Sequence, residues 1–197
     1  MNYLTRSVEP LLRDLCNHFP VVAVLGSRQV GKSTLLQHLF AESHALFVFD
    51  PVEDVGQARK DPDLFLSNNP GNLLLDEVQF APELLPALKR RIDRDPSPGQ
   101  FLLSGSQNLA ISKRIAESLA GRVAILELPP MTWKEMNGIP HDSYLWNWVH
   151  GENPVLPRTS DDPPSWQRAM FRGGMPGLLG LPDRLVSRFF SSYLQTY

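Results

Sequence analysis

The glycine-rich stretch at residues 26–33 constrains this chain more than any other part of it. It reads Gly-Ser-Arg-Gln-Val-Gly-Lys-Ser and fits the pattern G-x-x-x-x-G-K-(S/T). Residues 21–25 before it form a continuous apolar, largely β-branched run, as expected of a strand buried on both faces. Residues 35–40 after it carry apolar side chains at helical spacing. The stretch therefore predicts a strand, a glycine-rich loop and a helix in direct succession.

Each residue type of this loop suits the binding of phosphate oxygens. We expect Gly26 and Gly31 to adopt backbone angles closed to other residues, so that main-chain N–H groups can surround the phosphates. Lys32 supplies a cation for the β- and γ-phosphates at the positive end of the helix that begins near it. Ser33 offers its hydroxyl to Mg²⁺. The alternative, an ordinary loop with a surface lysine, leaves the flanking strand and helix unexplained. The expected nucleotide contacts are Gly26, Ser27, Arg28, Gln29, Val30, Gly31, Lys32, Ser33 and Thr34.

A second informative stretch is the apolar run at residues 73–75, which ends in two acids, Asp76 and Glu77. An acid at the end of a buried strand can hold the water shell of Mg²⁺ opposite Ser33, and we assign this role to Asp76. Glu77 can orient and deprotonate an attacking water. The alternative is a surface strand end with two solvated acids, and the upstream loop favours the functional interpretation.

Five apolar runs alternate with helical segments along the chain. The runs lie at residues 21–25, 45–49, 73–75, 101–103 and 123–128. This alternation predicts an α/β fold with a parallel five-stranded sheet and helices on both faces. The predicted helices include residues 3–19, with an apolar stripe of Val8, Leu11, Leu12, Leu15 and Phe19, and residues 82–94 and 109–119. The last helix has a predicted stripe of Leu185, Phe189, Phe190 and Leu194.

Composition excludes several classes of protein. The net charge of −2 gives no electrostatic support for nucleic-acid binding. The basic residues between 89 and 94 are interrupted by an acid and are interpreted as a solvated helix face, with a nucleic-acid patch as the alternative. The single cysteine, Cys16, rules out a disulfide framework. No apolar run approaches the roughly 20 residues of a membrane span, and no signal peptide is recognisable, so we expect a cytoplasmic protein.

Several stretches together resemble a family of prokaryotic AAA-type P-loop ATPases whose ATP-binding domain precedes a C-terminal domain of unknown function. They are residues 26–33, 75–79, 82–89, 101–106 and 117–123. The resemblance implies a P-loop NTPase sheet of order 5-1-4-3-2 and an ATPase core at residues 1–135. It is poor over a proline-rich insert at 136–165. It returns at Gly173-Gly174-Met175-Pro176 in a small helical lid, residues 166–197, which we expect to begin a longer C-terminal region.

The same resemblance implies roles for individual residues. Lys32 and Ser33 are ligands of ATP and Mg²⁺, Asp76 is the Walker B acid, and Glu77 is the catalytic base. Ser104 or Ser106 senses the γ-phosphate, and we favour Ser104 because it follows the apolar run directly. Arg122 is expected to reach the γ-phosphate of a neighbouring subunit in a homo-oligomer. The alternative is a structural arginine that pairs with an acid such as Glu117 or Glu127. Pro176 is expected near the adenine or ribose.

The expected function is that of an ATP-binding protein whose Mg²⁺-dependent hydrolysis resets a conformational switch acting on a protein partner or on a C-terminal domain. One alternative is a nucleotide-binding interaction module that does not hydrolyse ATP; Glu77 argues against it. The other is a small-molecule kinase, for which the sequence shows no acceptor signature. The string Asn-Lys-x-Asp, typical of guanine specificity, is absent, which favours ATP over GTP.

Overall fold

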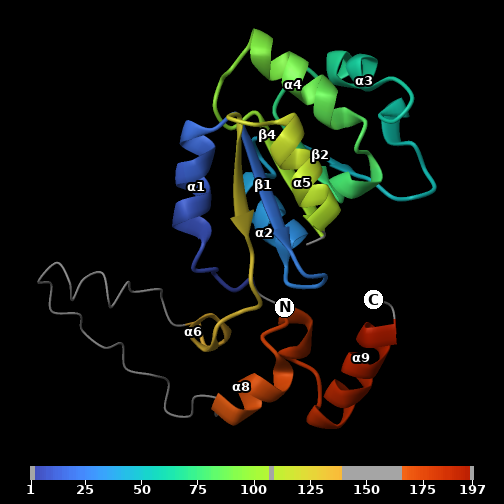
Figure 1. Cartoon of the computed structure of the whole chain (residues 1–197). Coiled ribbons are helices and arrows are strands. Elements are labelled where there is room, and N and C mark those ends of the chain that lie inside the picture. The colour runs from blue at the N-terminus through green and yellow to red at the C-terminus, as the bar shows by residue number, and fades with distance from the viewer. Residues whose placement is uncertain (1–2, 107–108, 139–165, 196–197) are drawn as a thin grey trace, which may run out of the picture. The chain divides into compact units, whose positions relative to one another are not determined.

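The computed structural model describes residues 3–106, 109–138 and 166–195 of the chain (Figure 1). They belong to two compact units, which are described separately. The core unit is Val8–Pro129. The second unit combines the first seven residues with the chain from Pro130 onward. The predicted insert lies almost entirely outside the described residues, because 139–165 are not among them.

The core unit is built on a five-stranded parallel sheet of order β2-β3-β4-β1-β5. Read from the other edge this is 5-1-4-3-2, so the predicted order is confirmed. The first strand, β1, pairs with β4 on one side and β5 on the other, at the centre of the sheet. The strands are β1 Val21–Gly26, β2 Ala45–Val48, β3 Leu73–Asp76, β4 Phe101–Ser106 and β5 Val123–Glu127.

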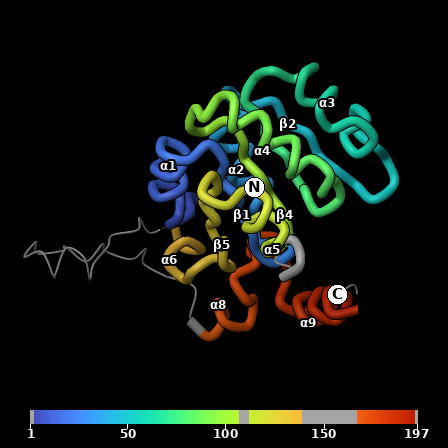
Figure 2. Tube along the Cα trace, turned by 45° about the horizontal axis from the view of Figure 1, so that its top comes forward, coloured from blue at the N-terminus to red at the C-terminus, as the bar shows by residue number. Residues whose placement is uncertain are grey.

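Helices cover both faces of this sheet, as the alternating pattern predicts. One face, with Ala23, Leu75 and Leu103, packs against buried side chains of α3, α4 and α5. The helix after the glycine-rich loop, α2, contacts β1 and β4 and lies on the other face (Figures 1 and 2). Burial on both faces explains why the central strands are uniformly apolar. The helices are α1 Glu9–His18, α2 Lys32–Phe40, α3 Pro62–Asn68, α4 Leu84–Arg94 and α5 Leu109–Ser118, with 3₁₀ turns at Val55–Gln57 and Val78–Phe80.

The strand at the sheet edge differs from the central ones. Leu46 and Val48 of β2 are 42% and 49% exposed, although their run reads as apolar as that of β1. An edge strand has a neighbour on one side only, so its side chains are covered less completely. Apolar content therefore predicted the strand but not its position.

The predicted helix at residues 3–19 is wrong at its start. The observed helix α1 begins at Glu9, with proline in its first turn, where the missing N–H costs nothing. Its buried side chains are Leu12 and Cys16, spaced by one helical turn, whereas Leu11 is 51% exposed. The residues before Val8 belong to the second unit.

The second unit is helical where it is described. Its elements are α6 Trp133–Met136, α8 Trp166–Arg172, a 3₁₀ turn Pro176–Leu178 and α9 Asp183–Gln195. Met175, Leu178 and Val186 form its small apolar core. The predicted stripe of the last helix is partly wrong. Leu185 and Leu194 are 39% and 73% exposed, whereas Val186 is fully buried. Phe189 and Phe190 of the predicted stripe do pack, partly buried, against the apolar core.

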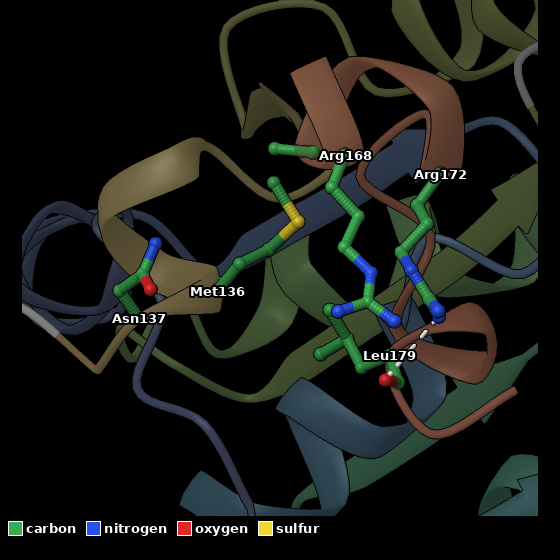
Figure 3. A pocket seen from close by; sticks show the side chains of 6 residues that line it. Met136, Asn137, Arg168, Arg172 and Leu179 are labelled. Atoms are coloured by element: carbon green, nitrogen blue, oxygen red, sulfur yellow. Dashed lines mark hydrogen bonds between the residues drawn. The ribbon is translucent and has the colours of Figure 1, made fainter. Parts of the chain in front are cut away.

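Two polar side chains organise the second unit. The buried Glu135 carboxylate accepts the backbone N–H of Thr132 at 2.7 Å, completing a capping box for α6, and lies 3.3 Å from Nε of Arg6. Arg172, also buried, donates to the carbonyl oxygens of Leu178, Leu179 and Leu181 and to Asp183. A cavity of about 220 Å³ lies beside Arg172 (Figure 3). Its lining is Met136, Asn137, Arg168, Ala169, Arg172 and Leu179.

Across the described part of the chain, every helix is too short or too polar to cross a lipid bilayer.

Candidate functional site

The carboxyl ends of three neighbouring strands bring the predicted site residues to one edge of the sheet. The strand β1 ends at Gly26, β3 ends at Asp76 and β4 ends at Ser106. The register pairs Gly26 with Ser106 and Val24 with Ser104, while Leu75 pairs with Leu103. Asp76 therefore lies beside Ser104, two residues deeper in the sheet than Gly26, where the glycine-rich loop starts. Ligands of open parallel sheets bind at this edge.

The glycine-rich loop contains two left-handed residues. Gly31 has φ 97° and ψ 24° and caps the N-terminus of α2, and Gln29 has φ 63°. A non-glycine residue in this region carries local strain. The expectation for Gly31 is confirmed, whereas Gly26 lies outside the left-handed region. Glycine is needed at position 26 for another reason, because a Cβ there would collide with the carbonyl oxygen of Leu128.

The Lys32 side chain lies inside the loop. It is only 5% exposed, and its Nζ donates to the carbonyl oxygens of Gly26 at 3.0 Å and Ser27 at 2.9 Å. Two backbone acceptors thus hold the ammonium among the loop residues rather than in solvent. The alternative of a surface lysine in an ordinary loop does not fit this burial.

Asp76 is the most tightly held acid of the site. It is 4% exposed, its carboxylate accepts the hydroxyl of the fully buried Ser104, and its Oδ1 accepts the backbone N–H of Glu77 at 3.1 Å. These bonds fix the orientation of the carboxylate. The alternative of a solvated strand end therefore fails for Asp76.

The donor set fits Mg²⁺ bound in the manner of nucleotide-dependent enzymes. Among the described residues no group of three or more His, Cys, Asp or Glu side chains could enclose a metal ion. Mg²⁺ commonly takes one or two protein oxygens and completes its shell with phosphate and water. The Asp76 carboxylate and the Ser33 hydroxyl are oxygens of this kind.

Glu77 has a conformation that few glutamates adopt. Its φ and ψ are 56° and 44°, in the left-handed region. Its Oε2 accepts a hydrogen bond from Nε2 of Gln79. Such a backbone costs about 1–3 kcal/mol and is typically found at functional sites. The backbone turn directs the chain away from β3 immediately after Asp76.

The two candidate serines differ in their surroundings. Ser104 is fully buried, and its hydroxyl is committed to Asp76. Ser106 is half-buried and pairs with Gly26 at the level where the loop begins. Burial thus separates two side chains that the sequence left as alternatives.

Arg122 lies just before β5, at the end of the sheet where the strands begin. The other candidates of the core unit lie at the end where the strands finish. The carbonyl oxygen of Arg122 accepts the N–H of Val21, the first residue of β1. Its guanidinium binds Asp93 at 2.5 Å and the carbonyl of Ala120 at 2.9 Å, not the acids at 117 or 127 that the sequence suggested. Pro176 belongs to the second unit, and its contact with a nucleotide stays a prediction.

Sequence reasoning missed the role of Gln79, which contacts the catalytic-base candidate from two residues away. The signal was available, because Gln79 belongs to the motif at residues 75–79. The contact between Gln79 and Glu77 depends on the 3₁₀ turn Val78–Phe80, which brings the Gln79 amide back toward Glu77.

Comparison with known proteins agrees with the fold and with the loop. A family model described as an AAA domain matches residues 18–137. Uncharacterized proteins of Mycobacterium tuberculosis and Mycobacterium bovis are each 34% identical to the chain over 165 residues, which is 82% of this chain and 36% of each relative. The chain thus spans about a third of the length of these relatives.

A solved structure with a similar fold is that of a Signal Transduction ATPase with Numerous Domains protein, carrying a tetratricopeptide repeat sensor, from Pyrococcus horikoshii. Its TM-score is 0.59 at 12% sequence identity, over 92% of this chain and 30% of that protein. At this identity the similarity concerns the fold alone.

Proposed function

Because the chain belongs to the AAA-type P-loop ATPase family, we propose that it binds ATP with Mg²⁺ and hydrolyses its γ-phosphate. The observation that carries this proposal is the meeting of three features at one sheet edge. They are the lysine enclosed by the glycine-rich loop, the buried and oriented Asp76, and the strained Glu77 next to it. A fold alone does not determine function, and these side chains supply the chemistry.

In this mechanism the loop N–H groups and Lys32 bind the β- and γ-phosphates. Arg28 is exposed in the same loop, and Thr34 is exposed in the first turn of α2. Asp76 and Ser33 would hold Mg²⁺, which neutralises charge on the phosphate oxygens when bound. Glu77 accepts a proton from the water that attacks the γ-phosphorus. Water gives its oxygen to phosphate, and ADP leaves.

The two serines take different roles in this proposal. Ser104 acts through Asp76, to which its hydroxyl donates. Ser106 lies at the level of Gly26 and is partly exposed, which supports it as the side chain that meets the γ-phosphate. This reverses the preference drawn from the sequence, where Ser104 was favoured.

The proposed biological role is a conformational switch. Residues 166–195 form helices with Pro176 in a short turn, and in this role they are the lid that responds to the bound nucleotide. Arg122, at the far edge of the sheet from the loop of its own chain, would serve a neighbouring copy. A non-hydrolysing nucleotide-binding module and a small-molecule kinase remain the alternatives.

Phosphate release from ATP tests the proposal. We expect Mg²⁺-dependent release by the full chain and a loss of about 10²-fold or more in Glu77→Gln, which keeps the size of the side chain and removes the base. ATP binding should be retained in this variant. Equal release by the two proteins would remove Glu77 from the mechanism.

The same assay separates the alternatives. A kinase would transfer the phosphoryl group to an added acceptor in preference to water, and a binding module would bind ATP without releasing phosphate. Lys32→Ala supplies the binding-deficient control, because it removes the cation that the loop encloses.

A further inference from the structure

Among the residues that the structure describes, Gln79 is the side chain that contacts the Glu77 carboxylate. Its Nε2 donates to Oε2 of Glu77. The direction of this bond follows from the chemistry, because an ionised carboxylate only accepts hydrogen bonds and so must face the NH₂ end of the amide. The other end of the amide, Oε1, must then point away from Glu77.

The environment of Oε1 is unfavourable for a polar atom. It is buried, and among the described residues no hydrogen-bond donor reaches it. It lies against Gly105 of β4, where a Cβ on the glycine would come within 3.0 Å of it. The nearby side chains around the same point are those of Leu25 and Val78, both apolar and buried. Gly105 therefore leaves the space that the amide occupies.

An unpaired buried polar atom of this kind costs about 1–3 kcal/mol. An apolar side chain of similar length would fill the same space without this cost. The left-handed backbone of Glu77 adds a further local cost within the same turn. Neither feature contributes to the stability of the fold, so the turn Glu77–Phe80 has the character of a functional element rather than a structural one.

We propose that Gln79 is a positioning residue for Glu77, whose carboxylate it holds in one orientation for the attack of water on ATP. This inference rests on the proposed ATPase function and adds a residue to it. The amide acts as a rigid bridge, with its oxygen end seated over Gly105 on β4 and its nitrogen end bound to the base. The amide thereby fixes the position of Glu77 relative to β4, the strand that also carries Ser104 and Ser106.

Gln79→Met tests the proposal, because methionine keeps the length and volume of glutamine without its amide. We expect kcat to fall by about 10²-fold, the cost of misplacing a catalytic group by about 1 Å. Affinity for a fluorescent ATP analogue should be unchanged. The melting temperature should stay the same or rise, since the buried unpaired oxygen is removed.

Gln100→Met is the matched control. Gln100 is also buried, but its Nε2 donates to the carbonyl oxygens of Asp95 and Ser97 at the other edge of the sheet. We expect this variant to lose thermal stability and to keep the kcat of the folded protein. The same substitution should thus have opposite consequences at the two positions.

A double-mutant cycle shows whether Gln79 acts through Glu77. In a Glu77→Gln background, with radiolabelled ATP used to follow slow release, Gln79→Met should cause no further loss. An equal loss in both backgrounds, an unchanged kcat in the single variant, or a melting temperature lowered as in Gln100→Met would each overturn the inference while the ATPase function stands. A wild-type chain without ATPase activity would overturn the proposed function, and this inference with it.

Discussion

The two ends of the strands in this sheet are built in opposite ways. We call the end at which the strands begin the amino edge, and the end at which they finish the carboxyl edge. At the amino edge, Arg91 donates to the carbonyl oxygens of Leu66 and Asn69 at 3.1 and 2.8 Å and to those of the two residues that follow Asn69. At the carboxyl edge, Gln29 and Glu77 adopt left-handed angles. At the amino edge the backbone carbonyl groups have hydrogen-bond donors, whereas the strained backbone angles lie at the carboxyl edge. One hydrophobic core supports both.

This difference indicates what each edge is for. Satisfied backbone groups stabilise the turns that begin the strands, whereas local costs are retained where chemistry requires them. The burial of Asp76 and of Lys32 is a local cost of this second type, since neither burial is needed to close a turn. The comparison predicts that substitutions at one edge alter stability and those at the other alter nucleotide chemistry.

Substitution of Arg122 has the largest expected effect on turnover. An effect on turnover would break the comparison, because Arg122 lies at the amino edge, where substitutions are expected to alter stability. If Arg122 serves the site of a neighbouring copy, turnover per subunit should rise with protein concentration. In Arg122→Ala this rise should be absent, so that turnover by the assembled protein is about 10³- to 10⁵-fold lower than in the wild type. ATP binding should be retained. Steady-state phosphate release across a concentration series measures both.

Asp93→Asn is the control for this experiment, because it breaks the ion pair of Arg122 and leaves the guanidinium in place. It should keep the concentration dependence. A flat rate per subunit for the wild type, or an equal loss in Asp93→Asn, would assign Arg122 to structure and restore the division between the edges.

Lys32→Ala should weaken the binding of ATP by about 2–5 kcal/mol, since it removes a buried, hydrogen-bonded charge at the phosphates. Titration with a fluorescent ATP analogue gives the affinity. Lys89→Ala, on the exposed side of α4, should bind normally. Similar affinities for the two variants would mean that the enclosed lysine does not meet the nucleotide.

Arg91→Met sharpens the comparison from the side of stability. We expect the free energy of unfolding to fall by about 1–3 kcal/mol, because carbonyl oxygens of α3 and of the turn before β3 lose their donor. Arg90→Met should cost less than Arg91→Met, since its bond to Asp63 is exposed. Denaturant titration measures both, and a change in the kcat of folded Arg91→Met would contradict the division.

His44 gives the smallest effect. Burial lowers the pKa of His44 below its ordinary value of 6.5, although its bond to the carbonyl of Gly99 at 2.8 Å acts in the other direction. The unfolded chain then binds the proton more tightly, so the contribution of His44 to stability is present above pH 6.5 and is lost as the pH falls through the lower folded pKa.

Melting temperatures between pH 7.5 and 5.5 check this effect. The wild type should lose stability on acidification more steeply than His44→Gln. The exposed His18→Gln should follow the wild type. A His44→Gln curve parallel to that of the wild type would show that the titration of His44 does not contribute.

The sequence predicted the strands well because they depend on local patterns of apolar residues. The run from Val21 to Leu25 is apolar for a reason visible in the sequence, namely a central strand with two covered faces. The strand order came from the resemblance to a family and was confirmed. The predicted start of α1 was wrong because the residues before Val8 belong to the second unit.

The site itself depended on contacts that no local pattern shows. Ser104 and Ser106 are separated by one residue and have similar chemistry, and only the register with β1 and the burial of Ser104 distinguish them. The partner of Arg122 was missed because Asp93 is far from it in sequence. The need for Gly26 came from Leu128, which follows β5 about a hundred residues later.

The close approach of Gly26 to Leu128 has a mechanical consequence. The N–H of Leu128 donates to the carbonyl of Leu25 at 2.7 Å, so the exit of β5 is bonded to the entry of the phosphate loop. With no side chain at position 26 to act as a spacer, main-chain atoms alone join the two backbones. Any side chain at position 26 would have to push the residue that follows β5 away from the phosphate loop.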